Sequence, residues 1–105
     1  MSIDHVKLEM EEWKQELETE IKQLKAEAVH AERQLDVLRG KNYILQSAAA
    51  KINDKGQQTT FFEENAANLW REIEAQEQIV DGLRHKLRRR SSHVNLIVSQ
   101  IELQY

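Results

Sequence analysis

The sequence predicts an all-α protein, a long antiparallel helical hairpin of the coiled-coil type. Three observations support this prediction: apolar residues recur every seven positions in both halves, the two series mirror each other about one point, and the only turn-like segment lies there. The chain of 105 residues has no proline and three glycines, and 31% of its residues are charged. This composition is typical of coiled coils and long helices.

The first predicted helix covers residues 3–52. Gly40 lies outside its apolar series and costs about 1 kcal/mol relative to alanine, too little to break so long a helix. A seven-residue repeat sustained over many turns predicts left-handed supercoiling about a partner helix. The apolar series consists of Ile3, Met10, Leu17, Leu24, Ala31, Leu38, Leu45 and Ile52.

The predicted turn covers residues 53–59, and the second predicted helix covers residues 60–103. Asn53, Asp54 and Gly56 suit a helix end that enters a turn. Thr60 and Glu63 have the spacing of a capping box, so the second helix is expected to begin at Thr60. Its apolar series consists of Ala66, Ile73, Val80, Leu87, Val94 and Ile101.

The mirror point between Lys55 and Gly56 predicts which residues face each other along the seam between the helices. It pairs Leu24 with Leu87 and Leu38 with Ile73. A second set of seam pairs obeys the same mirror, and four of its pairs place a polar residue opposite an apolar one. The set consists of Ala49 with Phe62, Asn42 with Leu69, Leu35 with Gln76, Ala28 with Leu83, Ile21 with Arg90, and Lys14 with Ile97. These polar residues either fix the register, as in other coiled coils, or lie at the seam edge and reach solvent. The second interpretation is favoured.

Large apolar residues outside the seam predict association with another protein. Two helices cannot cover them, and exposed apolar groups gathered in one place mark interaction surfaces. A second copy is the simplest cover, so we expect a homodimer that forms a four-helix bundle. The predicted protein-interface residues are Val6, Trp13, Leu96, Val98 and Leu103 near the termini, Tyr43, Ile44, Phe61 and Trp70 near the turn, and Ile79.

Charge is distributed in blocks along a chain whose net charge is −3. Residues 1–39 hold ten acidic and six basic side chains, whereas residues 84–92 hold five basic and no acidic ones. The basic block is a candidate site for nucleic-acid phosphates or acidic lipids, formed by Arg84, Lys86, Arg88, Arg89 and Arg90. Pairing with acidic residues of the facing helix is the favoured explanation, and the acidic net charge argues against a dedicated nucleic-acid binder.

The sequence predicts no catalytic, cofactor-binding or metal-binding site. The chain contains no cysteine, which excludes disulfides and thiolate ligands to zinc. The histidines lack the spacing of a recognised metal motif, and there is no glycine-rich phosphate loop or nucleophile elbow. Carboxylates on a two-helix surface lack the pocket that would shift their pKa values for catalysis. We therefore expect no enzymatic activity and no cofactor.

The N-terminal sequence lacks the apolar core of a secretory signal, and no stretch approaches the roughly 18 apolar residues needed to cross a membrane. We expect one soluble, cytoplasmic domain that covers residues 1–105.

Three functions remain open. The leading one is a non-enzymatic coiled-coil structural or adaptor protein that self-associates and docks into a larger protein assembly. The alternative is a small acidic helical chaperone, of the export or assembly type, whose polar seam residues leave the pairing imperfect for exchange with a helical partner. The third is a binder of nucleic acid or anionic membrane through residues 84–90. The chain carries no motif of a named family.

Overall fold

The computed structural model describes residues 2–105, with side chains from Asp4 onward. The described chain forms three α-helices, which are α1 Ser2–Ala49, α2 Lys55–Asn65 and α3 Ala67–Gln104, and it contains no strand. The prediction of an all-α helical hairpin is confirmed. The predicted seam residue Ile3 lies outside the residues whose side chains are described.

The structure divides into two compact units. Unit 1 contains the described residues of Met1–Ala28 together with Gly82–Tyr105, and unit 2 contains Val29–Asp81. Helices α1 and α3 each contribute residues to both units. That the whole chain forms one domain stays a prediction.

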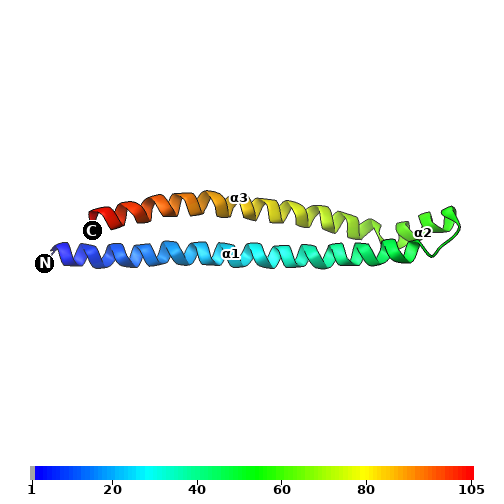
Figure 1. Cartoon of the computed structure of the whole chain (residues 1–105), viewed down its shortest axis with the longest axis horizontal. Helices are drawn as coiled ribbons and strands as arrows, with labels where there is room; N and C mark the ends of the chain where they lie inside the picture. Colours follow the sequence, from blue (N-terminus) through cyan, green and yellow to red (C-terminus); the bar gives the residue numbers. More distant parts are fainter. Residues whose placement is uncertain (1) are drawn as a thin grey trace. The chain divides into compact units, whose positions relative to one another are not determined.

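In unit 1, the first part of α1 and the last part of α3 lie side by side in opposite directions, shown in blue and in orange to red in Figure 1. Ion pairs across the two helices fix this direction, since Lys14 reaches Glu102 at 3.1 Å and the later Glu20 reaches the earlier Arg90 at 2.6 Å. The buried residues all belong to the predicted seam: Leu17, Leu24, Ala28, Val94 and Ile101. The heptad pattern therefore predicted the core of this unit.

In unit 2, the second part of α1 packs against α2 and the start of α3. Hydrogen bonds show the same antiparallel direction, because Gln76 of α3 bonds Ala31 and the earlier Trp70 bonds the later Asn42. The buried residues are again seam residues: Ala31, Leu35, Ala49, Ala66, Leu69 and Val80. Burial of this apolar stripe, and not intrinsic helix propensity, supplies most of the stability of helices of this kind.

The polar seam residues do not simply reach solvent, as the favoured interpretation held. Asn42, Gln76 and Arg90 are each half-buried, and each bonds to the facing helix. A half-buried polar group gains by finding a partner, because leaving it without one costs about 1–3 kcal/mol. These bonds support the other interpretation, in which the polar residues fix the register.

The predicted boundaries around the turn are wrong. Helix α1 ends at Ala49 instead of residue 52, and α2 begins at Lys55 instead of residue 60. Asp54 is the N-cap of α2, and its carboxylate accepts from the Gln57 backbone N–H at 3.1 Å. An aspartate at this position satisfies one of the amides that the first helical turn leaves without a partner.

The predicted capping box is consequently absent. Thr60 lies inside α2, where its hydroxyl donates to the Gly56 carbonyl at 3.2 Å. The second predicted helix is also interrupted at Ala66, between α2 and α3. The interruption is local: Ala66 donates to the Phe62 carbonyl at 2.8 Å and accepts from the Trp70 amide at 2.9 Å.

Candidate protein-docking site

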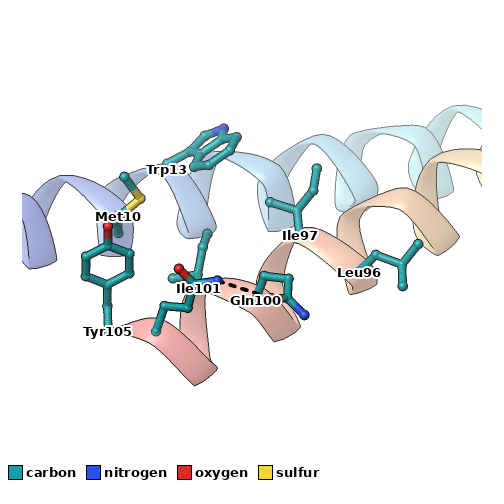
Figure 2. Close-up of a pocket in the computed structure, with 8 residues that line it drawn as sticks. Met10, Trp13, Leu96, Ile97, Gln100, Ile101 and Tyr105 are labelled. Carbon is teal, nitrogen blue, oxygen red and sulfur yellow. Dashed lines mark hydrogen bonds between the residues drawn. The ribbon is translucent and has the colours of Figure 1, made fainter.

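An open apolar groove of about 360 Å³ lies in unit 1 between α1 and α3. Figure 2 shows Met10 and Trp13 projecting from α1, while most of the other lining residues come from α3. We call it the terminal groove, and it is lined by Met10, Trp13, Leu96, Ile97, Gln100, Ile101, Gln104 and Tyr105. The two glutamines are the only amides in a lining otherwise made of apolar and aromatic side chains.

The heptad pattern explains how this groove arises. Met10, Ile97 and Ile101 occupy seam positions, where the two helices face each other. Trp13 and Leu96 lie beside the seam, with 43% and 65% of their surfaces exposed. Large apolar side chains therefore extend the apolar surface from the seam to exposed positions beside it. Gln104 donates to Gln100 at 3.3 Å, a bond that holds the two amides to each other (Figure 2).

The structure brings together only part of the predicted group near the termini. Trp13 and Leu96 both line the terminal groove, whereas Val6, Val98 and Leu103 do not. Val6 and Val98 are half-buried, and Leu103 is exposed.

Sequence reasoning missed three lining residues that it could not assign to the seam: Gln100, Gln104 and Tyr105. A usable signal existed for Gln100. It lies four residues after Leu96, and residues four apart share one face of a helix.

Among the predicted interface residues near the turn, Trp70 and Phe61 already contact other side chains of this chain. The Trp70 indole donates to the Asn42 side-chain oxygen at 2.7 Å, and its ring lies 5.7 Å from that of Phe62. Phe61 in turn packs edge-on against Phe62 at 5.8 Å. Since Trp70 already has a polar and an aromatic partner, it is less available to another protein.

Unit 2 also has an apolar groove. Ile44 lines a groove of about 370 Å³ together with Lys41, Leu45, Asn65 and Leu69. Tyr43 and Ile79 are exposed and lie outside it. The lining of this groove includes no aromatic side chain, in contrast to the terminal groove.

The basic block is partly committed to an ion pair within unit 1. The Arg90 guanidinium donates two hydrogen bonds to the Glu20 carboxylate, at 2.6 and 3.0 Å. These bonds lower the pKa of Glu20 and raise that of Arg90, although partial desolvation opposes both shifts. The other four basic residues of the block are exposed. Pairing with an acidic residue of the facing helix is thus confirmed for Arg90.

A second ion pair lies close to the terminal groove. Lys14, at a seam position, reaches Glu102 at 3.1 Å and Glu11 at 3.9 Å. The hydrogen bond to Glu102, followed by the nearby charge of Glu11, raises the pKa of Lys14. The two ion pairs of Lys14 and Arg90 bind α1 to α3 on either side of Leu17.

Among the described residues, no group of three or more histidine, aspartate or glutamate side chains is arranged to hold a metal ion. In the same part of the chain, no helix is both long and apolar enough to cross a membrane. Comparisons of the chain with protein-family models, curated proteins and solved structures found no match. Function is therefore inferred from the surfaces described above.

Proposed function

We propose that this chain is a non-enzymatic structural or adaptor protein, which self-associates and docks into a larger protein assembly. The observation that carries the proposal is the terminal groove, where Trp13, Leu96 and Tyr105 surround an apolar hollow. Aromatic and methionine side chains are enriched at protein interfaces, and tryptophan and tyrosine often dominate their binding energy. A surface of this composition suits contact with another helix.

The chaperone alternative has less support. It relied on an imperfect seam that would open for exchange with a partner. Asn42, Gln76 and Arg90 are the polar residues that suggested such a seam, and each bonds the facing helix. The anion-binding alternative is also weakened, because Glu20 already neutralises Arg90.

A double substitution tests whether the terminal groove is a docking surface. Sedimentation equilibrium of the purified wild-type chain at micromolar concentration should give a mass above the 12.4 kDa of one copy. Replacing Trp13 and Leu96 with serine should weaken self-association roughly thirtyfold or more, because truncating one central interface residue can cost about 2 kcal/mol. Helical content, measured by circular dichroism, should stay close to that of the wild type.

The matched control replaces Leu8 and Val29 with serine. These residues have 66% and 43% exposure, close to the values of Leu96 and Trp13, and neither lines the groove. The control variant should associate like the wild type. A monomeric wild-type chain would rule out self-association, and equal affinities for the two double variants would rule out the groove as its site.

A further inference from the structure

The terminal groove lies in an acidic part of the chain. Its lining residues all come from residues 4–16 of α1 and residues 96–105 at the end of α3. Together these two stretches hold six acidic and two basic side chains, so they are more negative than the whole chain, whose net charge is −3. Where these charges lie relative to the groove determines which partner fits it.

Both basic residues lie away from Trp13. Lys14 reaches Glu102 at 3.1 Å and Glu11 at 3.9 Å. Lys7 lines a separate hollow of about 210 Å³ with the same two glutamates, and Trp13 does not line it. Lys7, Glu11 and Lys14 are spaced by four and three residues, so they share one side of α1. Within this stretch of α1, the Trp13 side therefore carries no lysine or arginine.

A row of three exposed carboxylates borders Trp13 on α1, and we call it the glutamate row. Glu9 precedes Trp13 by four residues and Glu16 follows it by three, so both lie next to it on the helix surface. Glu12 stands three residues after Glu9 and four before Glu16, and it lines a hollow together with Glu16. Glu9 contacts His5 at 3.3 Å. Among the described residues, neither Glu12 nor Glu16 takes part in an ion pair.

The α3 wall of the groove is uncharged. Leu96 and Ile97 are apolar, and the exposed Gln100 and Gln104 supply amides. The one charged residue of this end of α3, Glu102, does not line the groove and is bonded on its other side. The groove therefore has an apolar lining, a neutral wall on α3 and an acidic border on α1.

From this distribution we infer that the terminal groove binds an amphipathic helix of another protein, whose apolar stripe is bordered along one edge by lysine or arginine. This inference rests on the proposed function and specifies the partner in the larger assembly. A helix bound in an apolar groove contacts it with side chains spaced i, i+3, i+4 and i+7. Such a stripe would cover the exposed Trp13 and Leu96, and the cations beside it would meet the glutamate row.

A second copy of this chain provides no such edge. If two terminal grooves face each other, the glutamate row of one copy lies against either the glutamate row or the neutral α3 wall of the other. Neither surface brings a lysine or arginine to the row, and carboxylates that face each other repel. Self-association through the groove should therefore be the weaker contact, and a basic helix should displace the second copy.

The apolar lining and the glutamate row have different roles in this contact. Trp13 and Leu96 lose exposed apolar surface when a helix covers them, which supplies most of the affinity. Exposed ion pairs contribute little each, so the glutamate row mainly selects among helices and sets their orientation. Binding should therefore require the groove and should favour cationic helices over anionic ones.

Two synthetic peptides of about 18 residues, or five helical turns, test the inference. Both carry leucine at positions spaced i, i+3, i+4 and i+7, and the neighbouring positions are lysine in one peptide and glutamate in the other. The wild type should bind the lysine peptide about tenfold more tightly at low salt, and this preference should shrink as salt screens the charges. Fluorescence anisotropy of the labelled peptides measures the affinities. Sedimentation should show one chain with one lysine peptide in place of two chains.

A pair of amide substitutions tests the glutamate row. Replacing Glu12 and Glu16 with glutamine should weaken binding of the lysine peptide about fivefold and should strengthen binding of the glutamate peptide, because two exposed carboxylates are removed. The matched control replaces Glu64 and Glu74 with glutamine. It removes the same net charge from exposed positions in unit 2, so it should bind both peptides like the wild type.

The variant with serine at Trp13 and Leu96 keeps every charge, so it separates binding in the groove from general attraction between an acidic chain and a cationic peptide. It should bind the lysine peptide roughly thirtyfold more weakly than the wild type. The variant with serine at Leu8 and Val29 should bind like the wild type. Circular dichroism should show unchanged helical content for every variant. If the first serine variant loses helix, Leu96→Gln alone replaces it and should weaken binding by a smaller factor.

The outcomes separate the inference from the proposed function. If serine at Trp13 and Leu96 abolishes self-association but the wild type binds neither peptide, or binds both equally, the docking surface stands and the inferred partner is wrong. Equal effects of the two glutamine pairs would overturn the role of the glutamate row. A wild-type chain that is monomeric yet binds the lysine peptide in the groove would support the inference and remove self-association from the proposed function.

Discussion

Arg90 occupies a seam position that a regular heptad would fill with an apolar side chain. The residue is half-buried, and its guanidinium donates two hydrogen bonds to the Glu20 carboxylate. Arginine can combine these roles because its stem covers apolar surface and its planar head binds a carboxylate at two points. The result is a polar residue that fits into a largely apolar seam.

Gln76 is also a polar residue at a seam position, and its side chain is neutral. Its amide donates to the Ala31 carbonyl at 3.0 Å and to the Gln34 side chain at 3.3 Å. A sliding of the two helices would remove these partners, so the bonds favour one register at some cost in stability.

The pair of Glu20 and Arg90 should make stability depend on pH. The pKa of Glu20 lies below its ordinary value of 4.5 in the folded protein, chiefly because Arg90 donates to its carboxylate. Its contribution is therefore complete above that ordinary value and is lost as the pH falls through the lowered pKa. Glu20→Gln should have a lower melting temperature than the wild type at about pH 6, and a smaller further loss on going to about pH 3.

Glu12→Gln is the control for this measurement, because Glu12 is exposed. It removes the same charge from α1, so it accounts for general effects of net charge. Thermal melts of the three proteins at each pH give the comparison. An equal pH dependence of Glu20→Gln and the wild type would show that the ion pair contributes nothing to stability.

The connection between α1 and α2 shows how a helix can end without glycine in a left-handed conformation. The described chain has no residue with positive φ. Instead, the Gln58 side chain folds back from α2 and donates to the carbonyls of Ala49 and Ile52, at 3.1 and 2.6 Å. The last carbonyls of a helix lack partners within the regular helix. The Ala49 carbonyl, at the end of α1, accepts both from the Ile52 backbone N–H at 3.0 Å and from this amide, so Gln58 adds a second donor at the C-terminal cap.

Gln58→Ala should destabilise the protein by about 1–2 kcal/mol, because it removes both hydrogen bonds at a partly buried site. Chemical denaturation monitored by circular dichroism measures the change. The control is Gln57→Ala, since Gln57 contributes its backbone amide to the Asp54 cap and keeps it in alanine. If Gln57→Ala and Gln58→Ala lower the free energy of unfolding by the same amount, the loss of stability does not come from the side-chain cap.

At the scale of the whole molecule, the chain has two compact units and each contains its own buried seam residues. Many large apolar side chains remain outside these cores: Leu8, Trp13, Val29, Val37, Tyr43, Ile44, Trp70, Ile79, Leu96 and Leu103. Two helices have too little surface to cover them, which is why small helical chains often gain stability by association.

Self-association should therefore be coupled to folding. If the dimer is the form that folds most stably, the melting temperature of the wild type should rise with protein concentration by mass action. The variant with serine at Trp13 and Leu96 should lose most of this dependence, while the variant with serine at Leu8 and Val29 should keep it. Calorimetry over a hundredfold range of concentration provides the measurement. A melting temperature independent of concentration in the wild type would contradict coupling between folding and association.

Only part of the candidate site could be predicted from single residues. Trp13 and Leu96 were predicted as interface residues because they are large, apolar and outside the seam, and they do flank one groove. Val98 and Leu103 met the same criterion but do not line it. Sequence spacing shows on which face of a helix a residue lies, whereas a groove depends on which side chains of two helices lie together.

The sequence by itself determined the fold class and the core. Apolar residues that recur every seven positions lie on one face of a helix, and that face must be buried. Among the residues whose side chains are described, every buried one belongs to a predicted pair of seam residues. The tertiary structure decided the exact ends of the helices at the turn, where Asp54 and Gln58 act as caps, and the partners of Arg90 and Gln76. These features depend on side-chain hydrogen bonds whose competing alternatives differ by about 1 kcal/mol, and such differences are settled only when the facing helix is in place.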